Sequence, residues 1–123
     1  MLQVTSVITD EELGGAPFVI LRSFFRQSRG EKTFLREDRY ETFGTVHPAS
    51  LEELQLLPGE YRHETVLNIH SPVPLSLGGR QDDLTFTDPD RILYRYQSYL
   101  VVSIRDWSPF GFCRALAVLL KET

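Results

Sequence analysis

The sequence has little cysteine and no long apolar run. Because Cys113 is the only cysteine, no internal disulfide can form, and nothing in the sequence requires an oxidising compartment. Residues 1–6 lack the basic segment and apolar stretch of an export signal, and no later stretch approaches the roughly 18 apolar residues that span a bilayer. The sequence therefore predicts a soluble protein of cytosolic origin with no membrane partner.

An excess of basic residues is also missing. Acidic residues outnumber basic ones 17 to 13, which gives a net charge of −4. Such a surface repels phosphate as a whole, so tight nucleic-acid binding has no electrostatic basis. A mildly acidic protein can nevertheless let DNA slide past it, and this leaves transient, non-specific contact with DNA open.

The length and composition are those of one globular domain. The chain has 123 residues, of which 41% are hydrophobic and 24% charged, and this balance is far from that of disordered chains. A chain of this size buries a core without disulfides or a structural metal. We expect a single domain over residues 1–123.

Short apolar runs separated by proline, glycine and polar residues predict an all-β fold. About six strands are expected, with one helix of about two turns that starts at the capping box Ser50-Leu51-Glu52-Glu53 and ends at Leu57. No alternation of strands and helices points to a parallel sheet, so a small antiparallel barrel or sandwich is predicted, and we expect the barrel. Seven candidate runs, from which we expect about six strands, cover residues 4–9, 18–27, 41–47, 63–70, 91–95, 99–105 and 112–120.

Period-two alternation assigns faces to the last two strands. Leu100, Val102 and Ile104 are the predicted core face of one strand. In the closing strand, Leu116 and Val118 are expected on the side opposite Ala115 and Ala117. These two strands and residues 91–95 form a predicted three-stranded meander.

Two segments lack strand character and are predicted to leave the body of the domain. Residues 28–40 mix basic and acidic side chains around one apolar pair, which is typical of a projecting loop or hairpin. Residues 71–90 contain several prolines and glycines and are too long for a tight turn, and such loops are usually functional. The basic residues of 28–40 favour contact with an acidic patch on another protein over contact with DNA, since acids lie among them.

The candidate metal ligands and nucleophiles do not form a known motif. His47, His63 and His70 match no metal-ligand spacing, and Cys113 lies within an apolar run, where free cysteine is usually a core residue. No Gly-x-Ser-x-Gly elbow accompanies a histidine. We therefore predict no metal, no cofactor and no enzymatic activity.

Three other features have structural explanations. Asp82 and Asp83 are adjacent on an extended chain and diverge, and the calcium-loop pattern is missing, so a solvated loop is expected. Gly78-Gly79-Arg80 lacks the lysine and hydroxyl of a phosphate-binding loop. Trp107 and Phe110 flank a turn, where they either cap the barrel end or anchor an interface.

The ordered motifs of residues 41–121 resemble a known family. They comprise Gly44-Thr45-Val46-His47-Pro48-Ala49-Ser50, Thr65-Val66-Leu67-Asn68-Ile69-His70, Arg91-Ile92-Leu93-Tyr94-Arg95, Tyr99-Leu100-Val101-Val102-Ser103 and Asp106-Trp107-Ser108. This pattern resembles the head-completion proteins of tailed bacteriophages, the stopper or collar family of the neck. One departure is Tyr96-Gln97 in the hairpin turn, where such proteins often carry a glycine.

The resemblance implies a fold, a location and partners. The implied fold is an SH3-like antiparallel β-barrel with one short helix and two long loops, and the implied place is the head–tail junction of the virion, after assembly in the host cytoplasm. The chain would form a six- or twelve-fold ring between portal or adaptor proteins above and tail proteins below, lining the DNA channel. The residues expected at its interfaces are Arg29, Lys32, Phe34, Leu35, Arg36, Arg39, Leu75, Leu77, Arg80, Asp82, Asp83, Phe86, Trp107 and Phe110.

Two alternatives stay open. A tail-completion or tail-terminator protein of the virion can share a related barrel. A small nucleic-acid-binding barrel would use aromatic side chains on a basic face, but the net acidity and the buried-looking aromatic pattern argue against it.

Overall fold

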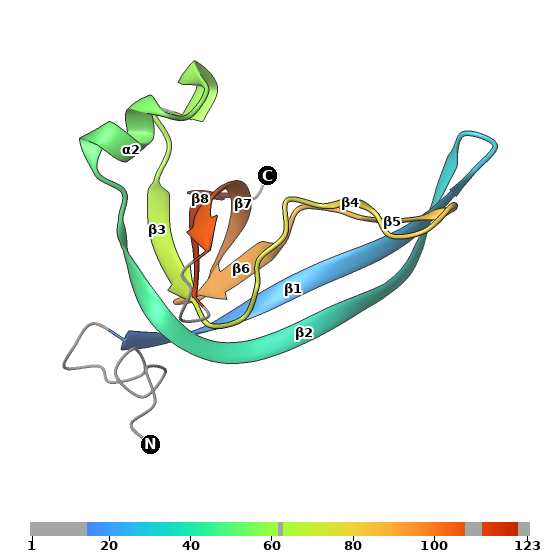
Figure 1. Cartoon of the computed structure of the whole chain (residues 1–123), viewed down its shortest axis with the longest axis horizontal. Coiled ribbons are helices and arrows are strands. Elements are labelled where there is room, and N and C mark those ends of the chain that lie inside the picture. Colours follow the sequence, from blue (N-terminus) through green and yellow to red (C-terminus); the bar gives the residue numbers. More distant parts are fainter. Residues whose placement is uncertain (1–14, 62, 108–111, 121–123) are drawn as a thin grey trace.

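A computed structural model describes residues 15–61, 63–107 and 112–120, with the backbone alone at 105–107. Almost all regular structure in this part of the chain is β-strand, and one short α-helix and one 3-10 turn interrupt it (Figure 1). The elements are β1 (Gly15–Ser28), β2 (Glu31–Pro48), α2 (Leu51–Gln55), η2 (Gly59–Tyr61), β3 (Val66–Ser71), β4 (Gly79–Arg80), β5 (Thr85–Thr87), β6 (Arg91–Tyr94), β7 (Gln97–Trp107) and β8 (Cys113–Leu119).

Every strand pair in the described sheet is antiparallel. The strands follow the order β2-β3-β8-β7-β6-β1-β5-β4, and β2 also pairs with β1. Six strands, β1, β2, β3, β8, β7 and β6, therefore pair in a closed cycle, while β5 and β4 extend the sheet outward from β1. The predicted all-β class with one short helix is confirmed. The predicted strand at 4–9 lies outside the described residues.

Of the two forms predicted for residues 28–40, a projecting loop or a hairpin, the structure shows the hairpin. β1 and β2 pair from Gly15↔Thr45 to Ser28↔Glu31, and Arg29 and Gly30 make the turn with φ of 53° and 79°. Two consecutive residues with positive φ match the twist of the flanking strands. The mixed charges that indicated a loop instead reflect a strand exposed to solvent on both faces.

Buried side chains form two clusters on opposite faces of β8. Ala115 and Ala117 belong to the main cluster, whereas Leu116 and Val118 pack in a second cluster with Leu57 below α2, as the alternation predicts. The main cluster comprises Phe18, Ile20, Leu67, Ile69, Leu75, Ile92, Tyr99, Val101, Cys113, Ala115 and Ala117.

The predicted core face of β7 is wrong by one residue over its first half. Tyr99 and Val101 are buried in the main cluster, while Val102 packs against the second one. The pairing with β8 shifts between Val101 and Ser103, so Val102 is an extra residue that reverses the alternation. Ile104 then faces the main cluster as predicted.

The helix begins at the predicted capping box. The Ser50 backbone N–H donates to Glu53 Oε1 at 2.8 Å, and the Glu53 N–H donates to Ser50 Oγ at 3.2 Å. The helix ends at Gln55, two residues before the predicted end. Leu57, just beyond it, is buried in the second cluster and holds the helix to the sheet.

The predicted loop 71–90 is largely attached to the sheet. Leu75 is only 3% exposed and belongs to the main cluster, so the prediction that it lies at an interface is wrong. An apolar side chain that fits the core gains more from burial there than from a loop position. Further along, β4 and β5 pair with each other, and β5 pairs with β1.

Candidate interaction surface

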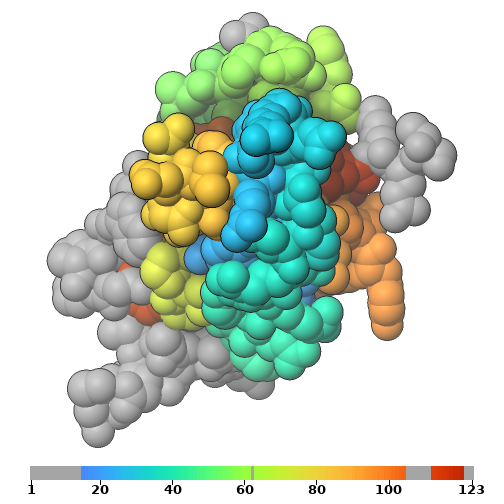
Figure 2. Space-filling view, turned by 90° about the vertical axis from the view of Figure 1, so that its right-hand side faces the viewer, coloured from blue at the N-terminus to red at the C-terminus, as the bar shows by residue number. Residues whose placement is uncertain are grey.

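A four-stranded sheet extends from the closed cycle and is called the arm below. It consists of residues 24–39 of the β1–β2 hairpin and residues 77–87, which contain β4 and β5. Figure 1 shows the hairpin reaching past the other strands, with β4 and β5 beside its far half. Figure 2 looks onto the tip of the arm, where the yellow 77–87 segment lies next to the blue and cyan hairpin.

Aromatic rings form a row across one face of the arm. The pairings place Arg80, Phe86, Phe25 and Phe34 in one line across the four strands. The rings of Phe25 and Phe34 meet edge to face with centroids 5.7 Å apart, and Phe34 is 56% exposed. Aromatic side chains of this kind, half open to solvent and held in place by their neighbours, are typical anchors of protein interfaces.

Cations border the aromatic row. Lys32 Nζ lies 4.1 Å from the centroid of Phe25, and the Arg80 guanidinium lies 5.7 Å from that of Phe86. On the opposite face, the Arg36 guanidinium lies 3.9 Å from the centroid of Phe24. Each contact fixes a long side chain against a ring, which lowers the entropy that a partner would have to remove on binding.

A β-bulge in the hairpin brings both residues of the apolar pair Phe34-Leu35 to the surface. Phe24 pairs with Arg36 and Phe25 pairs with Phe34, so Leu35 is the extra residue. Both Phe34 and Leu35 are exposed. A bulge lets two successive side chains leave the strict alternation of a strand, and here it leaves both members of the pair on the surface.

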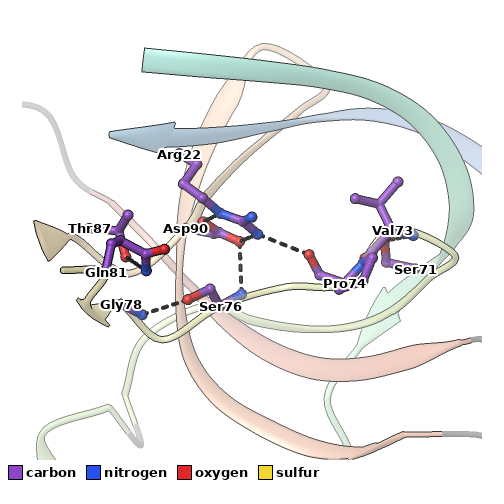
Figure 3. Close-up of polar contacts among 9 residues, drawn as sticks. All are labelled: Arg22, Ser71, Val73, Pro74, Ser76, Gly78, Gln81, Thr87 and Asp90. Carbon is purple, nitrogen blue, oxygen red and sulfur yellow. Dashed lines mark hydrogen bonds and ion pairs between the residues drawn. The ribbon is translucent and has the colours of Figure 1, made fainter. Parts of the chain in front are cut away.

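An ion pair between half-buried Arg22 and fully buried Asp90 attaches segment 71–90 to β1 (Figure 3). Arg22 Nε donates to Asp90 Oδ1 at 2.9 Å, and Arg22 Nη2 donates to Asp90 Oδ2 at 2.8 Å. Arg22 Nη2 also donates to the Pro74 carbonyl at 3.0 Å, and the Ser76 N–H donates to Asp90 Oδ2 at 2.8 Å. The hydrogen bond to Asp90 raises the pKa of Arg22 although burial opposes it. The segment is therefore fixed at Pro74 and at Ser76 through their backbone groups.

The turn between β4 and β5 is held by Asp82. Its Oδ1 accepts hydrogen bonds from the N–H groups of Leu84 and Thr85 at 3.0 and 2.8 Å. These bonds lower the pKa of Asp82, so the turn carries its negative charge at neutral pH. The neighbouring Asp83 is exposed, and the tip of this turn is acidic.

Most residues predicted at interfaces lie together on the arm, although the pairing that joins them was not predicted. Leu75 is in the core, the side chain of Trp107 lies outside the described side chains, and Phe110 lies outside the described residues. The arm carries Arg29, Lys32, Phe34, Leu35, Arg36, Arg39, Leu77, Arg80, Asp82, Asp83 and Phe86.

Sequence reasoning missed the ion pair and the row of rings. One signal for the pair was present, since Arg22 interrupts the apolar run 18–25 and a charge inside such a run requires a partner. The identity of that partner, Asp90, has no local signal because 68 residues separate the two. Phe25 is half-buried beside Phe34, and no spacing in the sequence indicates that contact.

A second polar cluster lies near α2, on β2 and β3. The rings of His47 and His70 lie 5.9 Å apart, Thr45 Oγ1 and His70 Nδ1 are hydrogen-bonded at 2.7 Å, and Asn68 donates to Glu53. Across residues 15–61, 63–107 and 112–120, no three His, Cys, Asp or Glu side chains are placed to hold a metal ion. In that same part of the chain, no helix has the length and apolar character needed to cross a membrane.

Comparison with known proteins adds one distant relative. No protein-family model matches the chain. A protein of Xylella fastidiosa strain 9a5c, described as an uncharacterized protein, is 25% identical to the chain over 119 residues, which cover 96% of this chain and 84% of that protein. The aligned region spans residues of both the closed cycle and the arm of this chain.

Proposed function

We propose that the chain is a structural subunit of a bacteriophage neck that assembles through its arm into a ring between head and tail. The observation that carries the proposal is the arm itself. It exposes Phe34, Leu35, Leu77 and Leu84 at 40–56% on a sheet that extends beyond the core. Apolar side chains gathered on one projecting element mark a protein interface, whereas scattered ones need no explanation.

The attachment of the arm supports assembly over a free loop. The Arg22–Asp90 pair, the core residue Leu75 and the β1–β5 pairing attach segment 71–90 to β1 and to the main cluster. A subunit whose contact surface is already ordered loses less conformational entropy on assembly. The polar and charged rim around the aromatic row is the arrangement of an interface core with its border.

The closed cycle of six strands is proposed as the SH3-like barrel of the neck family. It supplies a rigid body with a continuous core, and the arm leaves it from β1 and β2. In a ring every copy uses two different surfaces, one for each neighbour. A six- or twelve-fold ring would contact portal or adaptor proteins above and tail proteins below, and an overall charge of −4 suits a channel through which DNA slides.

A tail-completion or tail-terminator role uses the same surface and differs only in its place in the particle. The nucleic-acid-binding alternative is weaker. The three cations of the arm that lie over rings could stack on bases in a single strand, but Arg36 and Lys32 already pair with Asp38 and Asp88. We therefore retain the virion role as the proposal.

The test replaces the exposed apolar pair of the arm by charge. We expect Phe34→Glu/Leu35→Glu to lower stability by no more than about 1–2 kcal/mol, because both side chains are exposed and the main loss is the contact of Phe34 with Phe25. The variant should stay folded in urea unfolding, and it should abolish rings in native mass spectrometry and the joining of heads to tails. The matched control is Leu51→Glu, an exposed leucine on α2 away from the arm. Normal particles with the arm variant would contradict the proposal, as would absence of the chain from particles.

A further inference from the structure

The arm has two open sheet edges. Across the arm, the strand order is β2-β1-β5-β4, so β2 forms one edge and β4 the other. From residue 31 to 44, β2 pairs with β1 on one side, and no described strand pairs with its other side, because β3 begins only at the level of Thr45. An unpaired edge of this length presents backbone N–H and C=O groups that can pair with another chain.

The directions of the four strands decide how a second copy can join. All three pairings in the arm are antiparallel, so β2 and β5 run one way while β1 and β4 run the other. Copies in a ring are related by rotation, and corresponding strands keep the same direction relative to the ring axis. The β4 edge of one copy is therefore antiparallel to the β2 edge of the next, and the alternation continues.

From this geometry we propose that the arm sheet is continuous between neighbouring copies, with the β4 edge of each copy added to the β2 edge of the next. The inference rests on the proposed ring and names the partner of the arm as a second copy of this chain. Such a contact is heterologous, since each copy gives two different edges, and it can close into a ring.

Charge and shape at the two edges fit this contact. The Gln27 N–H donates to the Leu84 carbonyl at 2.9 Å, and Gln27 pairs with Lys32, so the acidic β4–β5 turn and Lys32 lie at one level on opposite edges. In a flat ring, Asp82 and Asp83 would then lie at the level of Lys32 of the next copy, whose ammonium also pairs with Asp88 of its own chain through an exposed contact. A Cβ built at Gly79 would meet no atom within 4 Å, which leaves space for a neighbouring backbone.

Thiol cross-linking of the purified full chain tests the two edges directly. Thr33→Cys lies on the β2 edge and Arg80→Cys on the β4 edge, and both residues are exposed. Within one copy these sites lie three strand spacings apart, roughly 14 Å. A bismaleimide whose reach is shorter than this distance therefore cannot link the two sites of one copy. The wild type, whose Cys113 is fully buried, is the control for background reaction.

The expected result is a ladder of covalent dimers, trimers and larger species from the Thr33→Cys/Arg80→Cys double variant. Either single variant alone should remain a monomer, and a mixture of the two should give dimers only. Gln81→Cys in place of Arg80→Cys repeats the test without removing the cation over Phe86. Each variant should keep the wild-type urea midpoint.

Two outcomes would overturn the inference. Efficient dimers from Thr33→Cys alone would show that two β2 edges pair with each other, and absence of the ladder from both double variants would show that the edges do not meet. Native mass spectrometry of the wild type separates the two proposals. If the wild type forms rings but the double variants give no cross-linked ladder, the shared sheet is wrong and the proposed function stands. If assembled particles contain no ring of this chain, both proposals are wrong.

Discussion

Arg22 and Asp90 face each other through two hydrogen bonds, 2.9 and 2.8 Å long, and Asp90 is fully buried. The pair joins the middle of β1 to the residue just before β6, so it fixes the point where the arm leaves the closed cycle. Asp90 also binds backbone groups, because its N–H donates to the Ser76 carbonyl and its carbonyl accepts from the Val101 N–H, both at 2.9 Å. Asp90 thus holds β1, the segment around Ser76 and β7 together, through its carboxylate and its backbone groups.

Arg22→Met should destabilise the protein by about 3 kcal/mol or more, because it leaves the Asp90 charge buried without its partner. The measurement is urea unfolding at neutral pH. The matched control is Lys32→Met, which breaks an ion pair whose side chains are 54% and 47% exposed. Exposed pairs of this kind contribute about 0–1 kcal/mol. Equal losses in the two variants would show that the buried pair does not hold the arm as described.

Gly44→Ala should also lower stability, by about 1–3 kcal/mol. A Cβ at this position would lie 2.1 Å from the His70 carbonyl oxygen and 2.8 Å from a ring carbon of Phe18, so β2 would have to move away from β3. Gly59→Ala is the matched control, since nothing lies within 4 Å of its Cβ. If thermal unfolding shows the same midpoint for both variants, β2 does not lie as close to β3 at Gly44 as described.

Tyr96→Gly should stabilise the protein by about 0.5–1 kcal/mol. Arg95 and Tyr96 form the two-residue turn between β6 and β7 with φ of 50° and 66°, a conformation that costs L-residues about 1–2 kcal/mol and glycine almost nothing. Tyr96 is fully exposed, so its ring contributes little packing. Tyr96→Ala keeps the unfavourable conformation and should show no such gain in urea unfolding. A gain of the same size in both variants would contradict the turn geometry.

Glu53 should make stability depend on pH. Burial opposes its ionisation, but the hydrogen bonds from the Ser50 backbone and hydroxyl outweigh burial and lower the pKa of Glu53 below 4.5. A lowered folded pKa contributes stability above the unfolded value, and this contribution is lost as pH falls through the folded pKa. Glu53→Gln should therefore be less stable than the wild type at pH 7, with the difference shrinking below about pH 4.

The control for that pH series is Glu52→Gln, in the same helical turn but outside the capping box. It should follow the wild type at every pH. Ser50→Ala should lose about 1 kcal/mol at neutral pH through the missing cap. A Glu53→Gln variant as stable as the wild type at pH 7 would show that the charge of Glu53 contributes nothing to stability.

The local features of the fold were predictable because they depend on neighbours in sequence. The capping box at Ser50, the faces of β8 and the strands around them follow from spacing alone. The bulge at Val102 was not predictable, because it depends on how β7 pairs with β8. The attachment of residues 71–90 likewise depends on Arg22, which is far away in the chain. The proline- and glycine-rich composition of 71–90 indicates a loop and gives no sign of that attachment.

The candidate site was predicted as a set of residues but not as one surface. Charged and apolar side chains in 28–40 indicated contact with a partner, and the strand pairings then brought Phe34 into line with Phe25, Phe86 and Arg80. Composition alone cannot show this alignment, since the three segments are joined only by the registers of β1, β4 and β5.

The most direct test of the proposed function is a cryo-electron microscopy map of tailed phage particles that carry this chain. We expect a closed ring of copies at the head–tail junction, with the exposed Phe34 of each arm buried against the adjacent copy. Particles whose neck lacks the chain, or a ring in which the arms point into solvent without touching a neighbour, would contradict the proposal.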